Sequence, residues 1–224
     1  MSIEVVVVGA GGFGRETLDV IEAHNASSPP EHVVVIGVAD DAPSDVNIER
    51  LRARGYRHLG GVSEVLNTFP AARYVLAVGS PALRRELSAS FDEKGWKATS
   101  VVHPAAVIGS IARIAEGAVI CGGVQLSTNT VLGRHVHVNP NATIGHDAVL
   151  EDFVSVNPAA VISGEVTVGA GALIGAGAVI LQSLTVGAGS VVGASACVTR
   201  SVEPNTTVIG VPARATLHGE EEPQ

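Results

Sequence analysis

A histidine followed directly by an aspartate interrupts an otherwise aliphatic and glycine-rich stretch, NATIGHDAVLED, at residues 141–152. An imidazole can act as a general base near neutral pH, which makes His146 a candidate catalytic residue. A neighbouring carboxylate can orient the ring and stabilise its protonated form, and Asp147 is placed for that role. From the spacing alone, a solvated surface histidine and an ordinary corner aspartate remain open as alternatives.

A second candidate site is the glycine-rich loop GAGGFG at residues 9–14, which follows the β-branched run IEVVVVGA and opens a helical segment. Gly9, Gly11 and Gly14 fit the pattern G-x-G-x-x-G, and Gly12 lies between them. After a strand and before a helix, this pattern favours phosphate binding at the helix N-terminus. Taken alone, the loop would suggest a dinucleotide.

Two more pairs of residues follow strands that should end at the same edge of a parallel sheet. Asp40 and Asp41 end the second predicted strand, where they either contact a base or ribose or form a solvated turn. Gly79 and Ser80 end the third predicted strand and are expected to line the same crevice. The N-terminal half therefore predicts a site for a phosphorylated ligand.

Strands and helical segments alternate from residue 3 to about residue 101. The helical segments include SDVNIERLRARG, GVSEVLNTF and PALRRELSASFDEKG, the last of which opens with Pro81. This order predicts a small parallel sheet with helices on both faces, an α/β Rossmann-like domain over residues 1–101. The acidic end of the chain, residues 215–224, is expected to be a loose tail.

From Val102 the chain follows a strict period of six, with seventeen hexads in register up to Glu203. Every first position is Val, Ile or Leu, and every fifth position is Ala, Val, Thr, Ser or Leu. The pattern predicts a triangular prism, in which three hexads form one coil of eighteen residues and aliphatic side chains stack inside. Such a prism, over residues 102–214, would be roughly 25 to 30 Å tall at ~4.8 Å per coil.

The hexad register places the histidine at a corner of this prism. His146 is the third residue of IGHDAV, where side chains are expected to point outward, with Thr128 one coil before and Gly164 one coil after. Two asparagines, Asn139 and Asn157, also stack one coil apart. Such a ladder is either part of an active site or a purely structural device.

Composition excludes several classes of function. Hydrophobic residues make up 46% of the chain and aromatic residues only 3%, so the core must be aliphatic. The net charge of −8 argues against nucleic-acid binding, which needs clustered Lys and Arg. Two cysteines suggest no disulfide framework, and no segment reads as a signal peptide or membrane span. We therefore expect a cytoplasmic protein that does not enter membranes.

The hexads closely resemble the left-handed parallel β-helix acyltransferases, whose handedness the periodicity itself does not reveal. VVGAGGFGRETLDVIE, AVGSPALRREL, IGHDAVLEDFVSV and the closing VIGVPAR resemble, more narrowly, the bacterial sugar acetyltransferases of NeuD/PglD type. The resemblance spans residues 4–214. It implies a homotrimer, acetyl-CoA bound in the groove between neighbouring prisms, and a nucleotide-sugar held by the N-terminal domain.

The same resemblance assigns roles to residues. It implies that His146 is the general base with Asp147 beside it, and that Asn139 belongs to the substrate site. It also implies that Gly164 offers a backbone N–H to the thioester carbonyl. The remaining acetyl-CoA contacts that it implies lie at four positions: Ser155, Gly175, Ala194 and Arg214.

One residue departs from the family pattern. Many members carry a second histidine nine residues after the catalytic one, and this chain has Ser155 there. A serine can donate a hydrogen bond but cannot take a charge, which puts a mechanism with two histidines in doubt. A metal site at His135 and His137 is disfavoured because no third histidine follows at a converging spacing.

The leading hypothesis is a metal-independent, acetyl-CoA-dependent N-acetyltransferase that acts on a nucleotide-linked amino sugar. The second is O-acetylation of a sialic acid or a related sugar. A nicotinamide-dependent oxidoreductase built on the glycine loop is a different class, but the prism supplies no obvious hydride site. A non-catalytic protein that binds sugar nucleotides is a further alternative, against which His146 argues.

Overall fold

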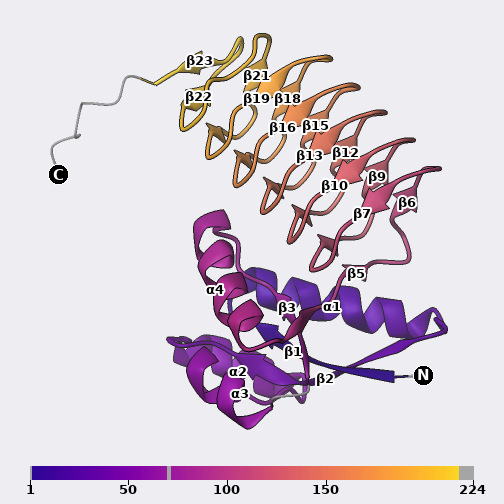
Figure 1. The fold of residues 1–224 in the computed structure, drawn as a ribbon, viewed down its shortest axis with the longest axis vertical. Helices are drawn as coiled ribbons and strands as arrows, with labels where there is room; N and C mark the ends of the chain where they lie inside the picture. The colour runs from indigo at the N-terminus through magenta and orange to yellow at the C-terminus, as the bar shows by residue number, and fades with distance from the viewer. Residues whose placement is uncertain (1, 70–71, 217–224) are drawn as a thin grey trace, which may run out of the picture.

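The computed structural model describes residues 2–69 and 72–216. An N-terminal α/β domain lies at one end of a tall stack of short strands, and the chain climbs away from that domain coil by coil (Figure 1). In the described segments, no helix has the length and apolar character that crossing a membrane requires.

The N-terminal domain is built on a four-stranded parallel sheet in the order β2-β1-β3-β4. Its strands are β1 (Ser2–Val8), β2 (His32–Ala39), β3 (Arg73–Leu76) and β4 (Lys97–Ala98). Its helices are α1 (Gly12–Ala26), α2 (Asp45–Ala53), α3 (Val62–Thr68) and α4 (Pro81–Glu93). These elements confirm the predicted alternation.

Alternate side chains of β1 enter two different cores. Val5 and Val7 pack with α1 and with Leu51 of α2, whereas Val6 and Val8 pack with α3 and with Phe91 of α4. A parallel sheet buried on both faces needs such a continuous apolar strand, which explains the run of four valines. Helices thus cover both faces, as the sequence predicts.

The second domain is a left-handed parallel β-helix with three faces. Face 1 contains β5 (Val101–Val102), β8 (Val119–Ile120), β11 (His137–Val138), β14 (Ser155–Val156), β17 (Leu173–Ile174), β20 (Val191–Val192), β22 (Thr207–Ile209) and β23 (Arg214–Ala215). Face 2 contains β6 (Val107–Ile108), β9 (Gln125–Leu126), β12 (Thr143–Ile144), β15 (Val161–Ile162), β18 (Val179–Ile180) and β21 (Cys197–Val198). Face 3 contains β7 (Arg113–Ile114), β10 (Val131–Leu132), β13 (Val149–Leu150), β16 (Thr167–Val168) and β19 (Thr185–Val186).

The hexad pattern explains the interior of this prism. First-position aliphatics such as Ile144 and Ile162 stack inside with no exposed area, and small fifth-position residues such as Ala148 and Ala160 fill the space beside the corners. The fourth position of every hexad from Ile111 to Ser195 has a positive φ, which turns the chain at each corner.

Both ends of the prism differ from the predicted boundaries. β5 begins at Val101, and β23 continues past residue 214 to Ala215, so the predicted tail begins inside a strand. The last predicted hexad leaves the register: Val202 pairs with Val186, sixteen residues earlier, and Asn205 takes the left-handed corner. The chain therefore closes its last coil two residues early. The rest of the predicted tail, residues 217–224, lies outside the described residues.

A buried arginine joins the two domains. Arg84 of α4 has no exposed area and donates from Nη1 to the carbonyl oxygens of Val78 and Gly79, at 2.9 and 3.0 Å. Its Nη2 donates to Phe153 O at 2.7 Å and to Ser155 Oγ at 2.9 Å on the prism. Within the described chain no carboxylate pairs with it, and burial lowers the pKa of Arg84 to about 9.

Two histidines are buried in the same interface. His135 stacks between the rings of Tyr74 and Phe153, and its Nε2 lies 3.0 Å from Ser88 Oγ. His137 packs on Phe13 of α1 with a ring-centre distance of 4.7 Å. Burial lowers the pKa of His135 to about 4, and burial also holds the pKa of His137 well below its usual value.

These histidines predict a stability that falls with acidification. When the pKa of a histidine is lower in the folded state than in the unfolded state, its full contribution to the free energy of unfolding is present above the unfolded-state pKa of about 6.5. That contribution is lost as the pH falls toward the folded-state pKa of about 4. The free energy of unfolding in urea should therefore drop between pH 7 and pH 5. His135→Asn, which tolerates the left-handed backbone, should flatten this slope, whereas replacing the exposed His32 with Asn should not. An unchanged slope in His135→Asn would refute the assignment.

Candidate active site

His146 stands at the corner where face 2 meets face 3, between β12 and β13. Its side chain is 59% exposed, and Asp147 follows at the fourth hexad position with a φ of +60°. Aspartate is one of the few residues that adopt this conformation readily. The corner turn therefore points the two consecutive side chains outward together.

The two side chains are in direct contact. His146 Nδ1 lies 2.7 Å from Asp147 Oδ2, and Asn129 Nδ2 donates to Asp147 Oδ1 at 3.0 Å. These hydrogen bonds, first that of His146 and then that of Asn129, hold the pKa of Asp147 below its usual value. Because an ionised carboxylate only accepts hydrogen bonds, Nδ1 carries a proton, and in the neutral form of the ring the lone pair is then on Nε2.

The imidazole ring occupies the space that a side chain at Gly164 would fill. A Cβ at Gly164 would lie 2.5 Å from His146 Nε2 and 2.6 Å from Cε1. The absence of a side chain at Gly164, one coil after His146, therefore makes room for the imidazole ring. The backbone N–H of Gly164, which was predicted to meet a thioester carbonyl, donates to no acceptor within the described chain.

An open groove of about 590 Å³ runs along face 2 beside His146. Its polar lining consists of hydroxyl and amide side chains: Ser110, Gln125, Ser127, Thr128 and Thr143. Val107 of the first coil, 56% exposed, contributes an apolar wall. The histidine therefore faces a site that can accommodate a small polar molecule.

A separate cavity of about 470 Å³ lies at the carboxyl ends of β1, β2 and β3. Six predicted residues line it: Gly9, Gly11, Gly12, Asp40, Asp41 and Gly79. Gly11 and Gly12 are open, with nothing within 4 Å of where a Cβ would stand. The structure thus brings together most of the residues predicted to hold a phosphorylated ligand.

The two aspartates of this cavity are already engaged. Asp40 Oδ2 accepts the N–H of Ala10 at 2.8 Å, and its Oδ1 accepts the N–H of Ala42 at 3.0 Å. Asp41 Oδ1 accepts the N–H of Val62 at 2.9 Å, at the start of α3. The sequence predicted either a ligand contact or a solvated turn for these two residues. In the structure, both carboxylates accept backbone N–H groups of the loops around the cavity.

The other predicted residues lie elsewhere. Ser80 is the N-cap of α4 and accepts the N–H of Leu83. Asn139 is 7% exposed and donates to Val156 O at 3.0 Å and to Asn157 Oδ1 at 3.4 Å, so it forms the structural ladder. Ser155 is 2% exposed and engaged by Arg84, which places it in the domain interface and gives no support to an acetyl-CoA contact.

The remaining predicted acetyl-CoA residues lie higher on the prism. Gly175 and Ala194 face each other at the corner between faces 1 and 2, where a Cβ on Gly175 would lie 2.5 Å from the Ala194 nitrogen. Arg214 lies in β23 at the C-terminal end, exposed. None of these three residues shares the corner of His146, which lies between β12 and β13.

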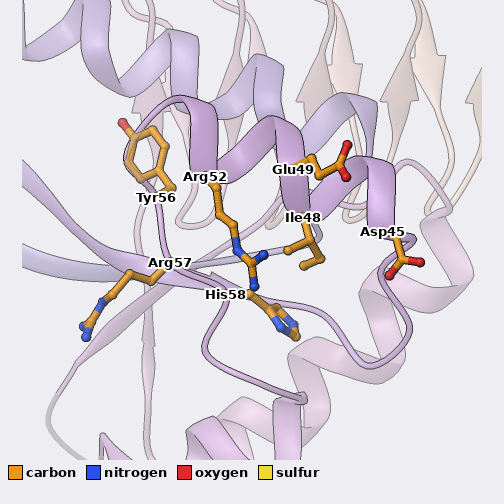
Figure 2. Close-up of a pocket in the computed structure, with 7 residues that line it drawn as sticks. All are labelled: Asp45, Ile48, Glu49, Arg52, Tyr56, Arg57 and His58. Atoms are coloured by element: carbon orange, nitrogen blue, oxygen red, sulfur yellow. The ribbon is translucent and has the colours of Figure 1, made fainter.

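A further hollow of about 700 Å³ lies outside α2 and contains none of the predicted site residues. Figure 2 shows its lining: Asp45, Ile48, Glu49, Arg52, Tyr56, Arg57 and His58. Its acidic side chains, Asp45 and Glu49, lie on one side and its basic side chains, Arg52 and Arg57, on the other, so the hollow carries charges of both signs. We do not assign a function to it.

Within one chain, the glycine-loop cavity and His146 lie on different sides of the prism. The N-terminal domain packs on face 1 and, through Arg84, on the corner between faces 3 and 1. His146 occupies the corner between faces 2 and 3. The triangular interior separates face 1 from this corner.

Comparisons with known proteins agree with this architecture. A family model described as the PglD N-terminal domain matches residues 4–91. The GDP-perosamine N-acetyltransferase of Escherichia coli is 31% identical over 152 residues, which cover 66% of this chain and 64% of that protein. The matched region thus spans slightly less than two thirds of the length of this curated relative.

Two solved structures match almost the whole chain. PerB from Caulobacter crescentus, in complex with CoA and GDP-perosamine, is 26% identical with a TM-score of 0.78, covering 95% of this chain and 97% of that one. The acetyltransferase domain of PglB from Neisseria gonorrhoeae, in complex with acetyl coenzyme A, is 27% identical with a TM-score of 0.82, covering 96% and 100%.

This chain is similar in sequence and in fold to the sugar acetyltransferases of NeuD/PglD type. The recognition from sequence is therefore confirmed, and so is the fold class of a Rossmann-like domain followed by a left-handed β-helix. Over the described residues, no three His, Cys, Asp or Glu side chains gather as a metal site would need.

Sequence reasoning missed two residues that matter for the site and for the domain interface of this chain. Asn129 completes the hydrogen bonding of Asp147, and its only signal was its place eighteen residues before Asp147. Arg84 fixes the domain interface, but nothing in its helix distinguishes it from its neighbour Arg85. Only the approach of α4 to the prism reveals that one is buried and the other exposed.

The glycines of the loop predict different effects on stability. Gly14 packs directly on the carbonyl oxygen of Gly9, so Gly14→Ala forces backbone atoms apart and should destabilise the protein by about 1–3 kcal/mol. Gly12→Ala, two residues earlier in the same helix, enters open space and should cost less than ~0.5 kcal/mol. Chemical denaturation of both variants measures the contrast. Equal losses would show that the close approach of α1 to β1 is not what Gly14 provides.

Proposed function

We propose that the chain is an acetyl-CoA-dependent N-acetyltransferase that acts on a nucleotide-linked amino sugar. The observation that carries the proposal is the exposed His146–Asp147 pair, whose ring lies over Gly164 beside an open groove. The likeness to the GDP-perosamine N-acetyltransferase and to PerB supports this choice of reaction and substrate class.

In the proposed reaction, His146 acts as the general base. Its Nδ1–H is held by Asp147, so Nε2 accepts a proton from the acceptor amine as the nitrogen attacks the thioester carbonyl. The developing oxyanion is stabilised by backbone N–H groups near Gly164. The tetrahedral intermediate then collapses, the C–S bond breaks, and the CoA thiolate leaves with the proton that the imidazolium returns. The reaction requires no covalent intermediate on the enzyme.

The glycine-loop cavity is proposed to hold the nucleotide part of the acceptor. The N-terminus of α1 and the open positions at Gly11 and Gly12 suit a diphosphate, because backbone N–H groups can approach it without obstruction. Asp40 accepts the N–H groups of Ala10 and Ala42, so its carboxylate helps to hold the loops around the cavity.

The active unit is proposed to be a homotrimer, with acetyl-CoA in the groove between neighbouring prisms. Since the nucleotide cavity and His146 lie on different sides of one prism, one chain must supply the cavity and its neighbour the base. The outer row of face 2 supports an interface, because it is uncharged: Val107, Gln125, Thr143, Val161, Val179 and Cys197.

The reaction is tested by measuring the free thiol of CoA as it is released, over a panel of UDP-, dTDP- and GDP-linked amino sugars. His146→Ala should lower kcat about 10²- to 10⁴-fold, the usual effect of a positioned general base. Because the side chain is largely exposed, the free energy of unfolding should change by less than ~0.5 kcal/mol. The limb of the wild-type pH profile that rises as the base loses its proton should vanish in this variant.

Replacing the half-buried His103, which lies in the first coil, with Ala provides a matched control and should leave kcat unchanged. Near-full turnover by folded His146→Ala would place the base elsewhere. Silence across the whole panel, together with CoA release on free sialic acids, would favour O-acetylation.

A mixing experiment tests whether the site lies between chains. Gly11→Val places a side chain in the nucleotide cavity and His146→Ala removes the base, so each variant alone should be nearly inactive. Unfolded together and refolded as mixed trimers, they should recover about a quarter of the wild-type activity, because one of three sites in each mixed trimer is intact. If cavity and base came from one chain, mixing would restore nothing. Light scattering that shows monomers of 22.7 kDa would also contradict the proposal.

A further inference from the structure

We propose that Asn129 is a positioning residue, which holds Asp147 and through it fixes the proton of the His146 ring. Asn129 does not touch the imidazole itself. The inference deepens the proposed function, and one of its two tests does not depend on that function.

The fourth hexad positions at this corner form a column along the prism: Ile111, Asn129, Asp147, Glu165 and Ser183. The backbones of Asp147 and Glu165 are stacked one coil apart, about 4.8 Å. Each carboxylate accepts a hydrogen bond from a neutral partner on its far side. Asn129 donates to Asp147 at 3.0 Å, and Ser183 donates to Glu165 at 2.8 Å.

The backbone does not require an asparagine at position 129. Ile111 and Ala159 have almost the same left-handed φ, 61° and 57°, as the 59° of Asn129. What asparagine adds is an uncharged N–H donor that reaches the next coil. The Asp147 main chain is anchored to the same place, because its N–H donates to Thr128 O at 3.0 Å. Residues 128 and 129 thus hold both the backbone and the side chain of Asp147.

The consequence concerns the two oxygens of the Asp147 carboxylate. With Oδ1 bonded to Asn129, Oδ2 is left to accept from Nδ1 of His146 at 2.7 Å. This contact keeps the proton on Nδ1 and the lone pair on Nε2, the atom that lies over Gly164. Without the amide, Asp147 can rotate in solvent, and the ring can carry its proton on either nitrogen.

The first test reads the proton position directly, with no turnover involved. Nitrogen NMR of the histidine rings at alkaline pH, with the His146 signals assigned by their loss in His146→Gln, should show mainly the Nδ1–H form in the wild type. Asn129→Ala should give a mixture of both forms, and so should Asn129→Asp, which keeps the shape but removes the donor. Ser183→Ala removes the equivalent bond one coil beyond and should leave the spectrum unchanged. An unaltered ring in Asn129→Ala would overturn the proposal.

The second test uses turnover in a double-mutant cycle. Asn129→Ala should lower kcat about three- to tenfold, as expected for one hydrogen bond, with KM for acetyl-CoA unchanged. In an Asp147→Ala background the same change should have no further effect, because Asn129 acts only through that carboxylate. An undiminished loss in this background, or an equal loss in Ser183→Ala, would refute the role. If the wild type releases no CoA, the proposed function fails and the NMR measurement alone decides on Asn129.

Discussion

The structure depends on one backbone constraint, the left-handed turn that recurs at every fourth hexad position of the prism. Fifteen consecutive corners, from Ile111 to Ser195, adopt it. Many of these residues are not glycine, asparagine or aspartate, and for them the left-handed conformation is energetically unfavourable. The packing of the aliphatic interior must offset this conformational cost. This turn directs the third and fourth positions of each corner away from the interior. At His135 and Phe153 these side chains meet the N-terminal domain, whereas at His146 and Asp147 they are exposed to solvent.

The second constraint is the joint between domains. A buried cation without a carboxylate is costly, and Arg84 is stabilised only by carbonyl and hydroxyl oxygens from both domains. Such a group is satisfied in one relative placement of the two domains. It therefore fixes the angle between the floor of the nucleotide cavity, at Val78 and Gly79, and the coil that contains Phe153 and Ser155.

Sequence reasoning was most successful where a short pattern determines a local structure. The period of six predicted the prism interior, and the strand-loop-helix context of Gly9 to Gly14 predicted the cavity, because both depend on neighbours along the chain. It was weakest for contacts between distant elements. The burial of Ser155 under α4 and the bonds of Asp40 to the glycine loop depend on docking that no local pattern encodes. The site roles of His146 and Asp147 remain predictions, although their contact is now part of the structure.

The eighteen-residue coil also restricts how such a chain can change length during evolution. Loss or gain of one residue within a strand of the prism would reverse which of the following side chains face the interior, whereas the last coil shows that a corner can lose two residues and keep Val202 and Val208 inside. A change of six residues would keep the interior intact but carry each later corner to the next edge. Before position 146, only whole coils can be added or removed while His146 keeps both its edge and its placement relative to the N-terminal domain.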